Sequence, residues 1–585
     1  MHPLTLSIPV TDRPEIEFLI REWGLPPERA TDVLALLETQ SMKGGTAQDL
    51  STGIPVDPSA WGDIARAEDV EGTPKPLVLS RAGAETCLQS WRYYSAERFI
   101  ARELLARARR RRQPLSKPSD ILMQRLKEQA PGNDDVLAPN DLQREGIRHA
   151  LENCLTLITG GPGTGKTTVV AHLLALLVDD RPGNPPVIRL AAPTGKAALR
   201  MRDAVKGIRI ASHFKPIQDE LDRIAGGADT LHQLLGFNPA TGSCRFNANN
   251  RLRADVVVID ECSMIDTLLW QSLLAALQES TCLILLGDPN QLESVAEGDV
   301  LGSLVREGED GSPSPLAPAW VRLVENHRSK GCKGIIDLAR ALENRDPRRA
   351  VDILRNHEVS RDRTSGQNDL QWHGDHGGGP TWDEMPDTVK SLLRAVALAK
   401  KPMCALKALD RIRILTPFRG KSGLGAIGLS RKIDRAIREE MSRTHPDRSP
   451  NEPVIIDRND RETGLKNGSI GVIMTERSGR VAYFPGKSGQ PPLRFELSQL
   501  PGERNSAWAM TVHRSQGSEF KVVFFVLPEP DSRLATRELV YTAITRAKSA
   551  IHIRGSDATI RSAAAGKSSR RTLLVHRLRD PEPAT

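Results

Sequence analysis

The sequence predicts an α/β fold built on parallel β-sheets, and three segments of its first half indicate this. Each is a short apolar stretch that ends in glycine or acidic residues and is followed by a helical pattern; they are residues 155–158, 256–259 and 283–286. Strands of a parallel sheet bury both faces, which explains why these stretches are apolar throughout. The carboxyl ends of parallel strands meet at one edge of the sheet, so we expect the functional residues there.

The first of these strands leads into a phosphate-binding loop. Residues 160–168 read GGPGTGKTT, which contains the pattern Gly-x-x-x-x-Gly-Lys-Thr, and a helical pattern follows. The glycines let backbone N–H groups turn toward phosphates, and the N-terminus of the next helix adds a favourable dipole. We expect Lys166 to reach the β- and γ-phosphates of a nucleoside triphosphate, and Thr167 to bind Mg²⁺. The predicted nucleotide-binding residues are Gly161, Pro162, Gly163, Thr164, Gly165, Lys166, Thr167 and Thr168.

Polar side chains at the ends of the other two strands predict hydrolysis. Asp260 follows the second strand and is expected to hold Mg²⁺ through its water shell, and Glu261 is expected to orient and deprotonate the attacking water. Gln291, five residues after the third strand, is placed where an amide can sense the γ-phosphate. Two adjacent carboxylates favour hydrolysis over binding alone, because a kinase would use a substrate hydroxyl in place of water.

Length and composition limit the class of protein. A chain of 585 residues is too long for one core and predicts two to four domains, and the net charge of +8 suits a polyanionic partner without identifying it. The seven cysteines are scattered and never spaced as Cys-x-x-Cys, which argues against a disulfide framework or a zinc site. We find neither a signal-peptide pattern nor an apolar run of membrane-spanning length, and therefore expect a cytoplasmic protein.

The C-terminal half predicts a second α/β domain. Apolar strands at residues 411–415, 522–526 and 550–553 alternate with helical stretches, and short strands within 468–500 indicate a small β insertion. Phosphoryl-transfer sites commonly receive an arginine from a neighbouring domain. The candidates are Arg328, just after the first domain, and Arg546, on an expected helix near the C-terminus.

The motifs in their order resemble the RecD helicase family, the alpha subunit of exodeoxyribonuclease V, within the superfamily-one helicases that move 5′ to 3′. The matching segments lie between residues 141 and 555 and include GGPGTGKTT, APTGKAA from Ala192, IDECSMID from Ile259, LLGDPNQLESV from Leu285, NHRS from Asn326, TVHRSQGSEF from Thr511 and YTAITRA from Tyr541. Two segments depart from the family pattern in their residues. They are the run PFRGKSGLG from Pro417 and the segment NHRS, which matches in position but differs from the more usual Tyr-Arg.

The resemblance implies roles for individual residues. Gln143 would contact adenine, Lys166, Glu261 and Gln291 would act in ATP hydrolysis, and Arg328 and Arg546 would complete the site from the second domain. It also implies a single-stranded DNA track whose residues contact DNA or couple it to the nucleotide: Pro193, Thr194, Lys196, His232, Asn467, Thr511, His513, Ser515 and Gln516.

The resemblance further predicts the domains and partners. We expect a helical partner-docking domain (1–125), followed by a RecA-like motor domain (126–330) with a hairpin near 236–250. A second RecA-like motor domain (331–575) is expected to carry an SH3-like, barrel-like β insertion near 466–503, and a tail (576–585) ends the sequence. Residues 76–79, Trp91–Tyr94 and Glu97 resemble the helical docking segment of the family. The expected partners are single-stranded DNA, duplex DNA ends, and RecB-like and RecC-like subunits.

The expected function is therefore an ATP- and Mg²⁺-dependent helicase that processes double-strand DNA ends for recombinational repair. No nuclease carboxylate cluster is evident in the sequence, so DNA cleavage is expected only from partner subunits. Two alternatives stay open: a stand-alone RecD-like helicase acting on DNA or RNA, and an NTP-dependent scaffold that does not translocate.

Overall fold

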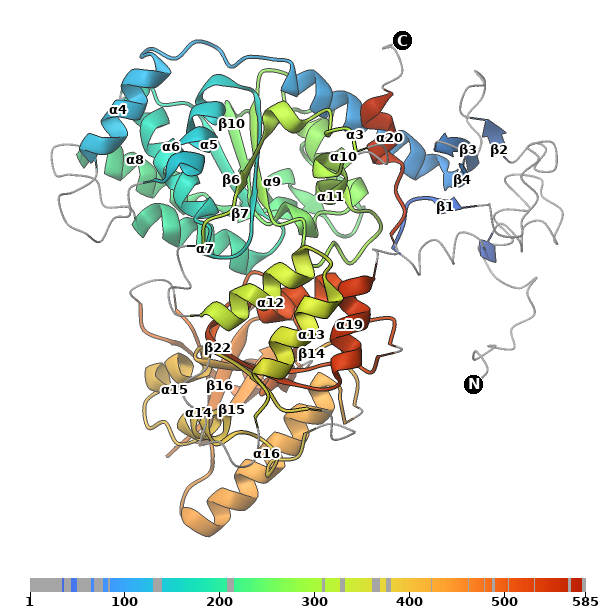
Figure 1. Ribbon diagram of the computed structural model, residues 1–585. Coiled ribbons are helices and arrows are strands. Elements are labelled where there is room, and N and C mark those ends of the chain that lie inside the picture. Colours follow the sequence, from blue (N-terminus) through green and yellow to red (C-terminus); the bar gives the residue numbers. More distant parts are fainter. Residues whose placement is uncertain are drawn as a thin grey trace.

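Two domains with parallel sheets form most of the molecule, and Figure 1 shows them one above the other with a smaller N-terminal sheet to one side. The computed structural model describes residues 34–35, 44–49, 65–67, 77–82, 85–129, 139–181, 183–207, 215–307, 311–326, 332–359, 369–374, 380–421, 423–460, 462–477, 479–486, 490–502, 504–530, 532–566 and 570–580. Within these ranges, no helix combines the length and the apolar character needed to cross a membrane.

The first domain contains a six-stranded sheet in the order β12-β5-β11-β10-β6-β7, and all its neighbouring strands are parallel. The three strands expected from the sequence are its centre. The strand bounds are β5 Leu155–Gly160, β6 Ile188–Ala192, β7 Asp229–Thr230, β10 Val256–Ile259, β11 Cys282–Gly287 and β12 Trp320–Leu323. The predicted parallel α/β fold is confirmed for this part of the chain.

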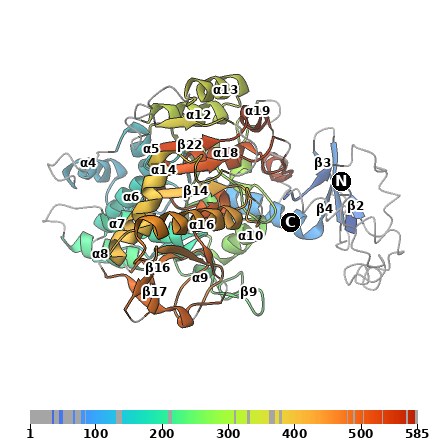
Figure 2. The same cartoon turned by 90° about the horizontal axis from the view of Figure 1, so that it is seen from below.

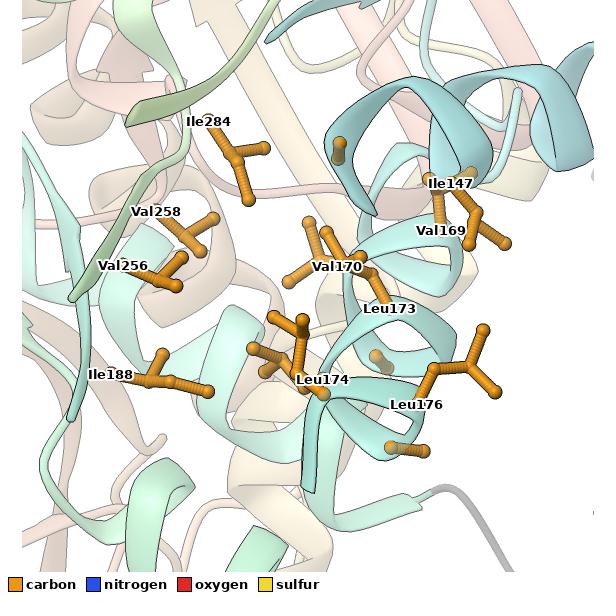
Figure 3. Close-up of a cluster of buried hydrophobic side chains, with 14 of the residues drawn as sticks. Ile147, Val169, Val170, Leu173, Leu174, Leu176, Ile188, Val256, Val258 and Ile284 are labelled. Carbon is orange, nitrogen blue, oxygen red and sulfur yellow. The ribbon is translucent and has the colours of Figure 1, made fainter. Parts of the chain in front are cut away.

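Alternate residues of these strands enter two different cores. Val256 and Val258 pack with helix α6 (Lys166–Asp180) on one face of the sheet, as Figure 3 shows. Val257 and Ile259 pack on the other face with helices α3 (Trp91–Ala108) and α10 (Thr267–Ala276). Burial on both faces is the reason that the strands are apolar without alternation. The helices of this domain are α4 Ser119–Gln129, α5 Asp141–Glu152, α6 Lys166–Asp180, α7 Gly195–Gly207, α8 Lys215–Gly226, α9 Leu231–Leu235, α10 Thr267–Ala276 and α11 Val300–Val305, with short 3₁₀ turns η4 Cys262–Met264 and η5 Ala317–Ala319.

A short hairpin projects from the first domain after α9. Strand β8, Phe237–Asn238, pairs antiparallel with β9, Ser243–Cys244. The hairpin lies within the stretch 236–250 where the sequence analysis placed an insertion. Gly236 begins it with a left-handed φ of 64°, and a Cβ there would lie 2.8 Å from the Cβ of Arg245.

The second domain has a five-stranded parallel sheet in the order β13-β22-β21-β14-β20. Its strands are β13 Leu370–Trp372, β14 Ile412–Thr416, β20 Ala509–Thr511, β21 Phe520–Val526 and β22 Ala547–Arg554. Its helices are α12 Lys333–Glu343, α13 Pro347–Asn356, α14 Asp387–Ala397, α15 Pro402–Leu409, α16 Ala426–Thr444, α17 Val512–Ser515, α18 Arg537–Ile544 and α19 Asp557–Ala565. The expected second α/β domain is confirmed by this sheet and the helices on both of its faces.

An antiparallel sheet is inserted into the second domain. The three short strands expected from the sequence are present, and two further strands give the order β18-β17-β16-β15-β19. Their bounds are β15 Glu452–Ile456, β16 Ile470–Glu476, β17 Gly479–Phe484, β18 Leu493–Glu496 and β19 Arg504–Ser506, with the 3₁₀ turn η6 Leu497–Gln499. Among the described residues, β18 and β19 do not pair, so the sheet is open there and the expected SH3-like, barrel-like form of the insertion is not confirmed.

The N-terminal part differs from the helical domain that we expected. Its described residues include a four-stranded sheet, β1 Gln48–Asp49, β2 Ala65–Ala67, β3 Leu77–Ala82 and β4 Glu85–Ser90, before helix α3, Trp91–Ala108. Residues 77–79 therefore form a strand, and the helical interpretation of residues 76–79 was wrong there. Of the residues expected in the helical docking segment, Trp91–Tyr94 and Glu97 lie in a helix. This helix, α3, begins after Ser90, whose side chain caps it by accepting a hydrogen bond from the Tyr93 N–H.

The C-terminus is also not the tail that we expected. Helix α20, Leu574–Arg579, packs on α3 and α11, as the red helix beside the blue one in Figure 1 shows. Leu574 and Leu578 are buried in the core of the first domain. The chain therefore returns from the second domain to the first before residue 580. Residues 581–585 of the predicted tail lie outside the described residues.

Candidate ATPase site and nucleic-acid interface

The phosphate-binding loop connects β5 to α6 at the carboxyl edge of the first sheet. Gly163 and Gly165 have φ angles of 83° and 85°, in the left-handed region that glycine tolerates and other residues rarely adopt. The ammonium group of Lys166 donates to the carbonyl oxygens of Gly160 and Gly161. Thr167 is partly buried and Thr168 is exposed. The loop thus has the shape that its sequence predicted, with the lysine folded over it.

Gln143 braces this loop from helix α5. Its Nε2 donates to the carbonyl oxygen of Thr164 at 2.9 Å, and its Oε1 accepts from the N–H of Asn140 at 3.1 Å. Gly165 has a left-handed φ that favours glycine, and a Cβ there would lie 2.3 Å from Nε2 of Gln143 and force this side chain to move. The resemblance assigned Gln143 to adenine, and the structure places it in direct contact with the loop that would hold the phosphates.

The two adjacent carboxylates follow β10. Glu261 has a left-handed φ of 54°, and its N–H donates to Oδ1 of Asp260 at 2.8 Å. Burial, together with the charge of Glu261, raises the pKa of Asp260 to about 6, and the positive charge of Lys166 opposes this rise. The backbone turn directs the two carboxyl groups differently, although they are neighbours in sequence. Asp260 is buried, whereas Glu261 is partly exposed.

These residues fit a magnesium ion. The Thr167 hydroxyl and the Asp260 carboxylate are hard oxygen donors, which Mg²⁺ prefers. Burial, as the larger cause, and the charge of Glu261 raise the pKa of Asp260, and a divalent cation beside this carboxylate would favour its ionised form. Thr167 and Asp260 are therefore the residues that would hold the ion, which would neutralise charge on the phosphates during transfer.

The sequence analysis did not identify Asp288 as a site residue. It follows β11 and is buried, and it accepts hydrogen bonds from Nε2 of Gln291 at 3.0 Å and from the Tyr541 hydroxyl at 3.1 Å. Burial raises its pKa, while Lys166 and these hydrogen bonds act in the opposite direction. A carboxylate directly after an apolar strand is the signal that also identified Asp260, so Asp288 was predictable.

Arg546 reaches across to Gln291 from the second domain. Its Nη2 donates to Oε1 of Gln291 at 2.8 Å, and its other nitrogens donate to the carbonyl oxygens of Thr542 and Ser518 at 3.2 Å each. Arg546 is only 1% exposed. The structure thus brings together Gln291 and Arg546, which are 255 positions apart and were predicted separately. The other candidate, Arg328, lies outside the described residues.

Further polar contacts join the two motor domains next to Gln291. The N–H of Leu292 donates to Oγ1 of Thr542 at 2.8 Å, and its carbonyl oxygen accepts from Nε2 of Gln516 at 2.9 Å. Arg200 of α7 forms an ion pair with Glu519 at 3.1 Å. Thr542, Glu519 and Arg200 were not predicted as site residues; single polar side chains of this kind carry no sequence signal without the fold.

The residues predicted for the DNA track occupy different environments. Pro193 and Thr194 directly follow β6, and Oγ1 of Thr194 accepts from the Ala197 N–H at 3.3 Å at the start of α7. His232 and Asn467 are exposed. The loop around Asn467 approaches α9, since Nζ of Lys466 lies 3.4 Å from Oε1 of Gln233. The first domain and the β insertion therefore meet beside these residues. In the view of Figure 2, α9 and the insertion strands β16 and β17 lie toward the same side of the molecule.

The motif from Thr511 lies at the end of β20. Thr511 caps α17 by accepting from the Arg514 N–H at 3.3 Å, and Ser515 is buried and donates to the Val512 carbonyl oxygen at 2.6 Å. Gln516 is also buried, and its amide contacts the first domain. Ser515 and Gln516 thus lie beneath the surface, where coupling between the domains is possible and direct contact with a nucleic acid is not. His513 is partly buried.

The fold and this site define a P-loop nucleotide hydrolase with two parallel-sheet domains, in which Arg546 of the second domain contacts Gln291 of the first. The family model of an AAA domain matches residues 143–297, and that of a UvrD-like helicase C-terminal domain matches residues 506–553. The chain is 35% identical over 531 residues to the RecBCD enzyme subunit RecD of Mycobacterium tuberculosis, covering 89% of this chain and 85% of that protein. It is 34% identical over 575 residues to the same subunit of Mycolicibacterium smegmatis, with 94% of each chain covered.

The chain therefore belongs to the RecD family of superfamily-one helicases, as the sequence motifs indicated. Its structure is also similar to that of Pif1 from Bacteroides bound to single-stranded DNA, with a TM-score of 0.38 and 17% identity over 72% of this chain and 92% of that chain.

Proposed function

We propose that this protein is an ATP-driven DNA helicase that moves 5′ to 3′ and acts as the RecD, or alpha, subunit of a RecBCD-type helicase–nuclease. It would assemble with RecB-like and RecC-like subunits and process double-strand DNA ends for recombinational repair. The relatives that match nearly the whole chain have the name of that subunit. ATP with Mg²⁺ is the proposed fuel.

One observation supports this function most directly. Gln291, the proposed γ-phosphate sensor, contacts Arg546, and the next residue, Leu292, is held by Gln516 of the motif proposed for the DNA track. A shift of Gln291 on phosphate release would therefore be transmitted to both elements of the second domain. This is the connection that a translocase needs and that a nucleotide-dependent scaffold does not.

The residues of the site divide the reaction between them. Backbone N–H groups of the loop and Lys166 bind the phosphates, and Glu261 orients the attacking water and accepts its proton. Arg546 places positive charge beside Gln291, where charge develops on the transferred phosphoryl group. Release of the inorganic phosphate after hydrolysis then removes negative charge that attracts Arg546, and the two domains separate on that side.

The defining experiment compares ATP hydrolysis with and without single-stranded DNA, using the wild-type chain and Lys166→Ala. We expect DNA to stimulate wild-type turnover, and Lys166→Ala to abolish it because the phosphates lose their main cationic contact. The wild type should unwind a duplex with a 5′ tail and not one with a 3′ tail. Turnover that is indifferent to DNA would favour the scaffold alternative.

Membership in a complex is tested separately. A tagged chain purified from its native lysate should retain two further large subunits, identified by mass, and DNA cleavage should accompany that complex only. Efficient unwinding by the isolated chain, with no retained subunits, would favour the stand-alone helicase.

The charge state of Lys196 leads to a prediction on pH. Burial, with the nearby charges of Arg413 and Arg514, lowers the pKa of Lys196 to about 8. The ammonium is therefore charged at pH 7 and loses its proton as the pH rises through this value. We expect the affinity for single-stranded DNA to fall by about tenfold between pH 7 and pH 9, the worth of one charge-assisted hydrogen bond to a phosphate.

The matched variant is Lys196→Arg, whose guanidinium stays charged over this range. Its affinity for DNA, measured by fluorescence anisotropy at constant ionic strength, should change much less with pH. Equal pH dependence of both proteins would contradict a phosphate contact at Lys196.

A further inference from the structure

Residues 290–298 form a segment that contains Gln291, the proposed phosphate sensor. This segment makes contacts with distant parts of the chain along its whole length. Its first residues contact the second domain: Nδ2 of Asn290 donates to Oε1 of Glu343 at 2.7 Å, Gln291 accepts from Arg546, and Leu292 is held by Thr542 and Gln516. Its last residues contact the N-terminal part. The Tyr93 hydroxyl donates to Oε2 of Glu297 at 2.8 Å, and the Gly298 N–H donates to the Gly44 carbonyl oxygen at 2.9 Å.

Between these two ends, the side chain of Arg570 contacts the segment at several points. Arg570 lies four residues before α20, where the chain returns from the second domain to the first. It forms an ion pair with Glu293 at 2.6 Å, and its Nη1 donates to the carbonyl oxygens of Ala296 at 2.8 Å and Gly298 at 3.1 Å. The side chains of Arg570 and Glu293 are 18% and 12% exposed, so water screens this pair less than it screens a surface pair.

Arg570 also lies close to the proposed DNA track. Its positive charge, together with burial as the larger cause, lowers the pKa of His513, which follows Thr511 in the motif of the second domain. Arg570 therefore contacts the segment that contains the phosphate sensor, and this segment contacts the DNA motif through Leu292 and Gln516. No contact of Arg570 with the phosphate-binding loop is found among the described residues.

We propose that Arg570 is a positioning residue for DNA-stimulated ATP hydrolysis: it fixes the 290–298 segment against the C-terminal return of the chain, so that DNA bound in the track acts on the position of Gln291 through the contact of Gln516 with Leu292. The planar guanidinium suits this role, because it contacts a carboxylate and two carbonyl oxygens at once, and a lysine lacks that fork. This inference rests on the proposed function, since it concerns the stimulation of hydrolysis by DNA.

The test is the ratio of DNA-stimulated to basal kcat in Arg570→Ala. We expect this ratio to fall by about tenfold, the size typical of coupling between two sites. The KM for ATP should stay close to the wild-type value, because the phosphate-binding loop is not contacted. Arg570→Lys should recover part of the ratio by restoring the pair with Glu293. A purely structural role would lower basal and stimulated rates together and leave the ratio unchanged.

Two further variants complete the design. Arg561→Ala removes an exposed arginine of α19, whose partner Asp557 is 4.0 Å away, and should leave the ratio unchanged. Glu293→Gln removes the ion pair from the other side with little change of shape, and it replaces Arg570→Ala if that variant does not fold. The inference is overturned if folded Arg570→Ala has the same ratio of DNA-stimulated to basal kcat as the wild type. The same result in folded Glu293→Gln overturns it if that variant is used instead. If the wild type itself shows no stimulation by DNA, the proposed function fails instead.

Discussion

Glu261→Gln is expected to lower the kcat for ATP hydrolysis by about 10² to 10⁴, the usual contribution of a general base, while ATP binding is retained. The amide has the shape of the carboxylate but cannot accept the proton of the attacking water. The phosphate-binding loop and Lys166 are untouched, so binding of a fluorescent ATP analogue should be close to that of the wild type. Steady-state hydrolysis and equilibrium binding, measured on the same preparation, separate the two effects.

A change at Asp260 should accompany this loss. The charge of Glu261 contributes to the raised pKa of Asp260, so the glutamine variant should lower that pKa and extend the ionised state of Asp260 to lower pH. Glu279→Gln is the control, because the Glu279 side chain is 76% exposed and forms its ion pair with Arg110, at the opposite end of β11. Unchanged turnover in Glu261→Gln would remove Glu261 from the mechanism and leave Asp288 as the remaining strand-end carboxylate to test.

Arg546→Ala is expected to lower kcat by about 10³ or more, the effect of removing a transition-state arginine in related chemistry. The buried guanidinium contacts Gln291 and is held by the carbonyl oxygens of Thr542 and Ser518, so its charge is placed with little freedom. The KM for ATP should change far less than kcat, because the ground-state phosphates are bound by the loop of the first domain. A loss confined to KM would contradict this role.

The same substitution has a cost in stability. It leaves the Thr542 and Ser518 carbonyl oxygens without their buried donor, which we expect to destabilise the second domain by about 1–3 kcal/mol. Thermal unfolding therefore has to be measured beside the kinetics, at a temperature where both proteins are folded. Arg546→Lys keeps the charge without the three-way contact, and Arg340→Ala, on the exposed side of α12, is the surface control.

Much of the nucleotide site was predictable because its residues follow one another along the chain. The loop Gly160–Thr168 and the pair Asp260–Glu261 each lie within one strand end, and hydrophobic patterning located those strands. The parallel sheet then follows, since three buried strands with helical connections have few other arrangements. Asp288 was missed although it has the same signal, a carboxylate directly after a buried apolar strand.

The N-terminal prediction failed for a physical reason. On the basis of the family resemblance, residues 77–82 were expected to belong to a helical domain. Their apolar residues Leu77, Val78 and Leu79 are instead buried in a β-strand. A short apolar run fits a helix or a strand equally well, and the neighbouring strand decides between them. Here β4 pairs with residues 77–82 over their whole length.

The sequence by itself determined the phosphate-binding loop, the two adjacent carboxylates after a buried strand and the helicase motif order, because these depend on residue types at fixed short spacings. Only the tertiary structure decided which residues act together over long separations. The contact of Arg546 with Gln291 and that of Arg570 with Glu293 join residues more than 250 positions apart, and α20 joins the core of the first domain. Such pairs arise from the packing of two domains and a returning chain, and no local pattern encodes them.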